Sequence, residues 1–193
     1  MKTAFILFDQ LTALDFVGVY DPLTRLRSMQ VMPAFTWSLC AFTKDVCDDK
    51  GLRFSPDVVA EPLDEYDLIV VPGGFGTRPL QHHEAFLDWL RTAQAVPLKV
   101  SVCTGAILLG AAGFLKGKRA TTHPHNFDEL APYCAQVVDQ RIVDEGDIVT
   151  ARGVTSAIDL GLYLVERLAG EAARTRIAKQ MHAAEPLDLR DAG

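Results

Sequence analysis

Hydrophobic residues gather along the chain in short runs rather than alternating with polar ones. The clearest runs cover residues 3–8, 34–42, 68–71 and 98–102, and each is followed within three residues by Asp, Lys, Pro or Gly. Continuous apolar strands of this length are typical of a parallel sheet that is covered on both faces. The pattern therefore predicts four buried, mostly parallel strands.

Between and after these strands, apolar residues recur at helical spacing. Phe86, Leu87 and Leu90 fall on one stripe, and Pro97 follows shortly after. Such a stripe with a proline beyond it is typical of a helix. Two turn signals rich in Asp and Gly each separate a pair of short apolar arms, which indicates hairpins. The predicted helices cover residues 84–95, 104–115, 155–168 and 171–184, and the predicted hairpins cover residues 46–54 and 141–150.

The alternation of strands and helices predicts an α/β fold, a doubly wound and mostly parallel sheet between layers of helices. The chain has 193 residues, with no linker and no internal repeat. A chain of this length can bury one substantial hydrophobic core. We therefore expect a single domain over residues 1–193.

Charge and cysteine content narrow the class of protein. The net charge is -6 and lysine and arginine form no cluster, so we expect no nucleic-acid partner. The apolar start of the chain stops at Asp9, and no later apolar stretch is long enough to span a bilayer. Cys40, Cys47, Cys103 and Cys134 form no C-x-x-C pair. These features predict a cytoplasmic protein with reduced thiols and no membrane association.

Ligands of open α/β sheets bind outside the carboxyl ends of the strands, so the residues that follow each strand are candidates for a site. After the run at 68–71 the chain continues as Pro72-Gly73-Gly74-Phe75-Gly76. Glycines there allow backbone N–H groups to approach an oxyanion or a carbonyl closely. A plain tight turn is the alternative interpretation. The segment is not a phosphate loop, because no Gly-Lys-Ser or Gly-Lys-Thr follows.

The second strand end reads Ser101-Val102-Cys103-Thr104-Gly105, between an apolar strand and a helix rich in Ala and Leu. This order is typical of a nucleophile elbow, a sharp turn that exposes one side chain at the edge of the sheet. Gly105 would give the turn room. A helix N-terminus favours thiolate over thiol, so we expect the pKa of Cys103 to be lowered. A buried core cysteine is the alternative.

The motifs together resemble the ThiJ/PfpI superfamily. The resemblance rests on Val71 to Gly74, on Ser101 to Gly105, on Gly117 to His123 and on Ala151 to Leu160, so it covers most of the chain. It implies a flavodoxin-like sandwich, a homodimer, and Cys103 as the reactive centre.

Within that superfamily, Cys103-Thr104-Gly105 is similar to isocyanide hydratases and to the sensor domains of AraC-type regulators. Asp15 matches the acidic residue that contacts the nucleophile in isocyanide hydratases. By itself Asp15 would be an ordinary helix N-cap. The resemblance implies that Cys103, Asp15 and Thr104 are catalytic.

The implied reaction is the hydration of an isocyanide to an N-formamide through a thioimidate on Cys103, with Asp15 moving the protons. Gly73, Gly74, Phe75 and His123 would bind the small-molecule substrate. No metal or organic cofactor is expected.

Three other functions stay open. Pro124 after His123 resembles the parkinsonism-linked branch, which favours glyoxalase or deglycase activity on methylglyoxal-type carbonyls with His123 as the base. An accessible thiolate beside an acid could also be a redox sensor that oxidises to a sulfinate. The last alternative is the ligand-sensing domain of a regulator. His123-Pro124-His125 lacks a carboxylate or thiol to complete a ligand set, so we expect no metal.

Overall fold

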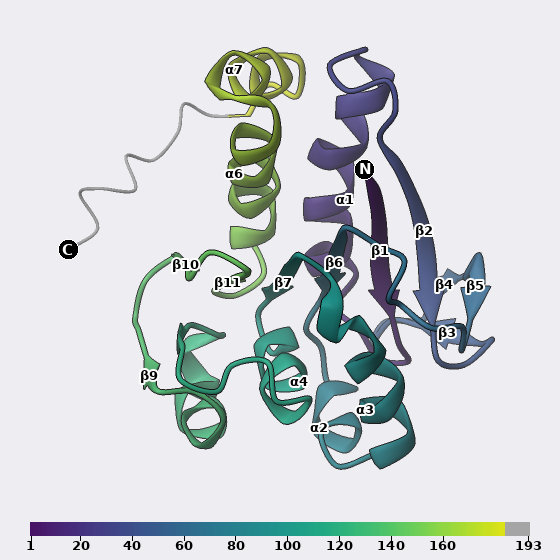
Figure 1. Cartoon of the computed structure of the whole chain (residues 1–193), viewed down its shortest axis with the longest axis vertical. Helices are drawn as coiled ribbons and strands as arrows, with labels where there is room; N and C mark the ends of the chain where they lie inside the picture. Colours follow the sequence, from purple (N-terminus) through teal and green to yellow (C-terminus); the bar gives the residue numbers. More distant parts are fainter. Residues whose placement is uncertain (184–193) are drawn as a thin grey trace.

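Seven strands form the central sheet within residues 1–183, which are the residues that the computed structural model describes. The strand order is β10-β11-β7-β6-β1-β2-β5, and every neighbouring pair is parallel except β10 with β11 (Figure 1). The strands are β1 (Lys2–Leu7), β2 (Thr36–Ala41), β5 (Val58–Val59), β6 (Leu68–Val71), β7 (Leu98–Val102), β10 (Ile142–Asp144) and β11 (Ile148–Ala151).

Two groups of helices cover the sheet. One group consists of α1 (Ala13–Ser28), α6 (Ser156–Ala169) and α7 (Glu171–Gln180), which pack on one another. The other consists of α2 (Thr77–Leu80), α3 (Glu84–Arg91), α4 (Gly105–Ala111) and α5 (Phe127–Leu130). The predicted doubly wound α/β fold is therefore confirmed.

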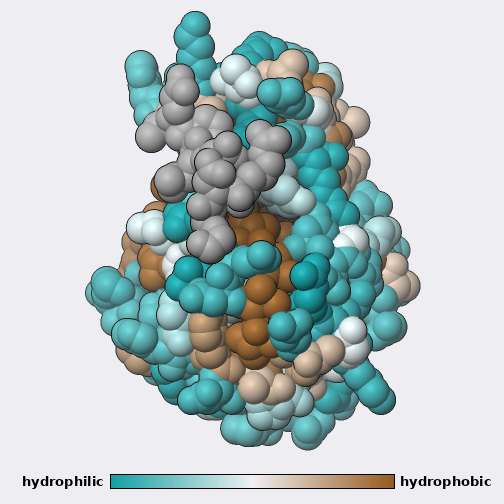
Figure 2. Space-filling model, turned by 90° about the vertical axis from the view of Figure 1, so that its left-hand side faces the viewer, coloured by the Kyte–Doolittle hydropathy of each residue, from teal (hydrophilic) through white to brown (hydrophobic). Residues whose placement is uncertain are grey.

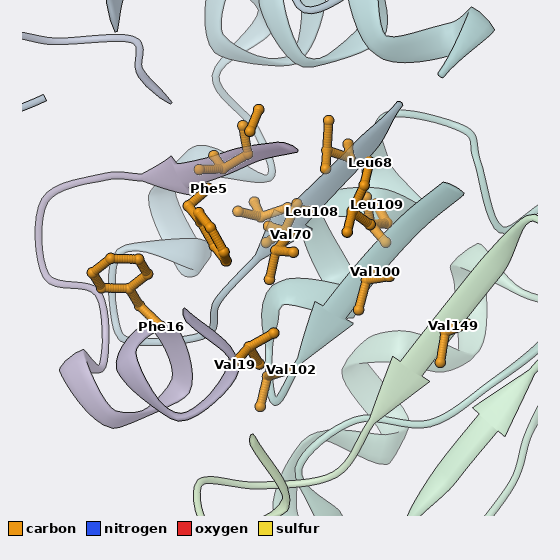
Figure 3. Close-up of a cluster of buried hydrophobic side chains, with 14 of the residues drawn as sticks. Phe5, Phe16, Val19, Leu68, Val70, Val100, Val102, Leu108, Leu109 and Val149 are labelled. Atoms are coloured by element: carbon orange, nitrogen blue, oxygen red, sulfur yellow. The ribbon is translucent and has the colours of Figure 1, made fainter. Parts of the chain in front are cut away.

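The core lies where these helices meet the strands. In Figure 3, Phe16 and Val19 of α1 pack with Phe5, Val70 and Val102 of the central strands. All residues of β6 and β7 are buried, as expected for strands that are covered on both faces. Each large apolar side chain among them contributes roughly 1.5–3 kcal/mol by leaving water. This packing holds β6 and β7 in place, and both strands lead into the site described below.

Most predicted elements are present with small changes of boundary. Both predicted hairpins form: β3 (Val46–Cys47) pairs antiparallel with β4 (Arg53–Phe54), and β10 pairs antiparallel with β11. The predicted helix at 84–95 is α3 followed by a 3-10 helix, Thr92–Ala95. The predicted helix at 171–184 is α7, and Ala184 lies outside the described residues. Short elements not predicted are α2, α5, β5, β8 (Arg119–Ala120) and β9 (Gln136–Val137).

No range was predicted for the helix α1, beyond the interpretation of Asp15 as an N-cap, although it is the longest helix of the described chain. It contains Gly18 and Pro22, which are ordinarily helix breakers. Here they face α6: a Cβ on Gly18 would lie 2.6 Å from the Cβ of Ala157, and Pro22 packs against Gly161. The small residues allow the two helices to approach closely, so tertiary packing outweighs local propensity.

The surface beside β9 and β10 is mostly hydrophilic, with a band of hydrophobic residues down its middle (Figure 2). None of the helices in residues 1–183 has the length and hydropathy needed to cross a membrane. All four cysteines lie in the described part of the chain and are free thiols.

Candidate active site

The two segments singled out in the sequence meet at one edge of the sheet. β6 and β7 are parallel neighbours, with Val71 opposite Ser101. The residues that follow each strand therefore emerge side by side, at the edge where open α/β sheets bind their ligands. Gly105 packs directly against the carbonyl oxygens of Val71 and Pro72, where a Cβ would not fit. The predicted need for a small residue at this position is confirmed.

Cys103 adopts the strained backbone of a nucleophile elbow. Its φ is 54°, in the left-handed region that side chains other than glycine rarely occupy. Such a conformation costs on the order of 1–3 kcal/mol and persists only where the surroundings impose it. The Cys103 N–H donates to the carbonyl of Ala151, which is the last residue of β11, and to that of Arg152, which follows it. The Cys103 side chain lines a cavity at this edge, although only 7% of the residue is exposed.

Asp15 lies beneath the same cavity, in the first turn of α1, and is fully buried. It is not the N-cap, which is Thr12. One carboxylate oxygen, Oδ2, accepts a hydrogen bond of 3.0 Å from the Gly73 N–H. The other, Oδ1, has no nitrogen or oxygen partner among the described residues. The carboxyl group instead interacts with the thiol of Cys103. A buried polar atom without such a partner is costly, so Asp15 is a candidate for a role beyond packing.

Gly73 lies where Cys103, Thr104 and Asp15 come together. A Cβ at Gly73 would lie 2.7 Å from the Cβ of Cys103, 2.7 Å from the N of Thr104 and 2.8 Å from Oδ2 of Asp15. Real side chains do not approach this closely, so only glycine allows the acid and the thiol to share the space.

Burial changes the acidity of both groups. It raises the pKa of Asp15 to about 7, against the smaller opposing effect of the Gly73 N–H. It also raises the pKa of Cys103 to about 12, with the nearby Asp15 charge as the next cause. The expected lowering of the Cys103 pKa is therefore wrong, because desolvation outweighs the favourable N–H of Thr104.

The two groups titrate as a pair, since each charge opposes the other. The pair loses its first proton near neutral pH and its second only at high pH. Between these steps the pair holds one negative charge and one proton, and the proton lies mainly on the sulfur because the pKa of Cys103 is the higher. The thiolate with a neutral Asp15 is one of the two arrangements of this singly charged state.

Thr104 and the glycine loop are tied together. The Thr104 hydroxyl accepts from the Gly74 N–H at 3.0 Å and lies 3.3 Å from the Gly74 carbonyl oxygen, to which it can donate. The N–H groups of Gly73 and Gly74, predicted to face a substrate, are thus already engaged inside the protein. Among the described residues the Phe75 N–H makes no hydrogen bond of this kind.

His123 also lines the cavity. Its Nδ1 accepts from the N–H of His125 at 3.3 Å, and its ring packs on Gly153. Burial, His125 and Arg152 lower the pKa of His123, which keeps the imidazole neutral at pH 7. Within residues 1–183 no group of three or more His, Cys, Asp or Glu side chains is arranged to hold a metal ion.

The cavity has a volume of about 370 Å³ and collects most of the predicted site residues. Gly74, Phe75, Cys103, Thr104 and His123 line it, and Asp15 and Gly73 lie just beneath. Five lining residues were not predicted: Thr12, Arg78, His125, Asn126 and Val154. Of these, Arg78 follows the glycine loop by two residues, and that proximity could have drawn attention to it.

The chain is similar in sequence and fold to known proteins. The sequence profile of the DJ-1/PfpI family matches residues 1–167. An isonitrile hydratase of Pseudomonas putida is 40% identical over 88% of this chain and 73% of its own length. Protein DJ-1alpha of Drosophila melanogaster is 32% identical over 61% of this chain and 55% of its own length. A crystal structure of a ThiJ/PfpI family protein from Pseudomonas syringae has a TM-score of 0.86 and 25% identity, and covers 96% of this chain and 76% of that one. The predicted flavodoxin-like sandwich is thereby confirmed.

Proposed function

The chain belongs to the DJ-1/PfpI family, and from this premise we propose that it is a cysteine-dependent hydratase of isocyanides, also called isonitriles. The observation that carries the proposal is the buried pair of Asp15 and Cys103 at the floor of the cavity. The 40% identity to an isonitrile hydratase supports the substrate class.

The first half of the reaction uses the pair in its thiolate form. The sulfur of Cys103 attacks the terminal carbon of R–NC and a C–S bond forms. The electron pair left on that carbon takes the proton from the Asp15 carboxyl group, which gives a thioimidate, R–N=CH–S–Cys103. Asp15 is then a carboxylate. A carboxyl group with a pKa of about 7 is well matched to this proton transfer at neutral pH.

The second half returns the pair to its starting state. The Asp15 carboxylate takes a proton from water as the water oxygen bonds to the thioimidate carbon, and passes that proton to the nitrogen, which becomes N–H. The hydroxyl group now on that carbon then gives its proton to Asp15. The C–S bond breaks, its electron pair stays on the Cys103 sulfur, and R–NH–CHO leaves. The sum is R–NC plus water giving the N-formamide.

Turnover of para-nitrophenyl isocyanide tests the proposal. We expect Cys103→Ala to lower kcat/KM by about 1,000-fold or more, because the covalent step is lost. Cys134→Ala is the matched control, since Cys134 is half-buried and lies outside the cavity, and it should react like the wild type. Full activity of Cys103→Ala, or no isocyanide loss by the wild type, would refute the hydratase assignment.

A glyoxalase acting on methylglyoxal is the second candidate. The observation that favours it is His123, a neutral imidazole on the wall of the same cavity and thus a possible base. Methylglyoxal loss that requires both Cys103 and His123, without isocyanide turnover, would establish it. If neither substrate reacts while peroxide selectively oxidises Cys103, the thiol is a redox sensor.

We also propose that the protein works as a homodimer in the cytoplasm. Leu14 and Val17 of α1 and Ile158 of α6 are large hydrophobic residues with at least 36% of their surface exposed. Val17 and Ile158 adjoin the Gly18–Ala157 contact between the two helices. Val17→Glu should shift the sedimentation coefficient toward that of a monomer, and an unchanged coefficient would exclude this face as the interface.

A further inference from the structure

Within the described part of the chain, the cavity is lined by one permanent positive charge, that of Arg78, and by no carboxylate. The imidazoles of His123 and His125 also line it, and the remaining lining residues carry no basic or acidic group apart from the thiol. Asp15 lies beneath the floor and is fully buried. The chain as a whole has a net charge of -6, so this concentration of basic groups runs against the overall balance. A concave site lined by one sign of charge attracts ligands of the opposite sign.

Arg78 is the one permanently charged side chain of the lining, and nothing in residues 1–183 neutralises it. It makes no ion pair there, whereas other arginines pair with carboxylates: Arg25 with Asp21 at 2.9 Å, and Arg91 with Asp88 at 2.7 Å. The guanidinium of Arg78 instead lies over the ring of Phe75, 5.0 Å from its centroid. A cation–π contact orients the planar group and leaves its N–H donors available.

Phe75 and Arg78 therefore form one two-part section of the lining of the cavity that Cys103 also lines. Phe75 is 58% exposed and offers apolar aromatic surface, and the Arg78 guanidinium over its ring offers a fork of donors. A guanidinium matches a carboxylate through two parallel hydrogen bonds, which an uncharged group cannot reproduce. A cavity of about 370 Å³ accommodates only a small substrate, so both parts would contact one molecule.

We propose that Arg78 determines the specificity of the site, and that the substrate is a small organic molecule bearing a carboxylate in addition to the group that Cys103 attacks. The isocyanide part of this statement rests on the proposed function. The preference for an anion does not, because it follows from the lining of the cavity alone.

The first experiment measures anion preference without any turnover. Iodoacetate and iodoacetamide alkylate the same thiol and differ in charge, so the ratio of their rate constants at Cys103 reports the field in the cavity. We expect Arg78→Gln to lower the iodoacetate-to-iodoacetamide ratio by about fivefold or more, and salt at about 0.5 M to lower the wild-type ratio as well. Peptide mass mapping assigns the modification to Cys103.

Arg176→Gln is the matched control, because Arg176 is an exposed arginine on α7 away from the cavity and its loss changes the net charge equally. The ratio should stay within twofold of the wild type in this variant. A ratio unchanged in Arg78→Gln, or lowered equally in Arg176→Gln, would overturn the proposal. So would a Cys103 that reacts with neither reagent, since the cavity would then not admit such ligands.

The second experiment applies the same logic to turnover. Isocyanoacetate and its methyl ester differ only in the carboxylate. We expect Arg78→Gln to lower kcat/KM for isocyanoacetate about tenfold more than for the ester, chiefly through KM, and Arg78→Lys to fall between. Equal losses on both compounds would contradict the role of Arg78. No turnover of either by the wild type would refute the proposed hydratase, while the alkylation ratio would still decide on the anion preference.

Discussion

The two ends of β7 each bury an ionisable side chain, and they treat it in opposite ways. At the start of the strand, Lys99 is 4% exposed, and its Nζ donates to the carbonyls of Gln94 at 3.1 Å and Val96 at 2.7 Å. The ammonium also lies 5.1 Å from the centroid of the Phe114 ring. At the other end, Cys103 has a strained backbone, and the carboxyl group beside it keeps one oxygen without a nitrogen or oxygen partner in residues 1–183.

The difference separates structure from chemistry. Burial lowers the pKa of Lys99, but its carbonyl partners still satisfy the charged form, so the group has nothing left to offer a ligand. Burial raises the pKa of both Asp15 and Cys103, and few bonds compensate them. Groups with strongly shifted pKa values beside a cavity are candidates for catalysis, so Asp15 and Cys103 are candidates and Lys99 is not. Replacing Asp15 or Cys103 should then change mainly the rate of the reaction, whereas replacing Lys99 should change mainly the stability of the fold.

The largest effect is expected at Asp15. Asp15→Asn should lower kcat/KM for the isocyanide by about 100- to 1,000-fold, because an amide can neither give nor take the proton. The neutral amide keeps an acceptor for the Gly73 N–H, so the loss comes from chemistry rather than misfolding. Steady-state kinetics check the rate. Turnover at the wild-type rate would remove Asp15 from the mechanism.

The same variant should change how stability depends on pH. The folded pKa of Asp15 is raised from 3.8 to about 7, so the folded state holds a proton that the unfolded state releases between these values. Stability of the wild type is therefore lost as the pH rises from about 4 to 7. Between pH 5 and pH 8 this group removes about 2–3 kcal/mol. Urea unfolding should show that part of the loss missing in Asp15→Asn, and identical pH profiles would contradict the shift.

The next largest effect is expected from Gly73→Ala. The added methyl group would overlap Cys103, Thr104 and Asp15 and should destabilise the fold by about 2–3 kcal/mol while slowing alkylation of Cys103. Gly113→Ala is the comparison: Gly113 has a φ of 95° and nothing within 4 Å of its Cβ position, so it carries only the conformational cost. Equal losses of stability in both variants would mean that crowding at the pair is unimportant.

A smaller effect, of the opposite kind, is expected from Lys99→Met. The methionine keeps the packing but leaves the carbonyls of Gln94 and Val96 without this donor, so the free energy of unfolding should fall by about 1–2 kcal/mol. Alkylation of Cys103 should proceed at the wild-type rate. Lys116→Met at an exposed position is the control and should change neither quantity. A change in the reactivity of Cys103 would contradict this prediction and would mean that the two ends of β7 are energetically coupled.

The smallest effect is a gain. Cys103→Gly should be about 1 kcal/mol more stable than Cys103→Ala, because glycine adopts a φ of 54° without strain. Thermal unfolding of the two variants measures the strain of the elbow directly. If the alanine variant is equally stable, the elbow stores no strain that a side chain would feel.

The sequence was most informative where residues act locally. The runs at Leu68–Val71 and Leu98–Val102 are buried strands because their own side chains favour that state, and the glycine at position 105 announced a tight turn. The extent of the helix α1 was not predicted because Gly18 and Pro22 disfavour helices by propensity. Only their contact with α6 makes them useful, and that contact lies far away in the sequence.

The acidity of Cys103 could not be predicted for a related reason. The sequence shows a helix N-terminus next to the thiol, but not how much protein surrounds it, and burial is the larger effect. The walls of the cavity come from several separate segments, so only the folded structure shows that Thr12 and Val154 line it. Asp15 was found through a resemblance, not through its spacing.

The contrast between the floor and the walls of the cavity bears on how the protein can evolve. At Gly73 and Gly105 any side chain collides with neighbouring atoms, so selection is expected to remove mutations at these two positions. Phe75, Arg78 and His125 are exposed, and each can be exchanged without disturbing the pair below. Lineages can therefore drift toward new substrates one wall residue at a time, while inheriting the same reactive floor.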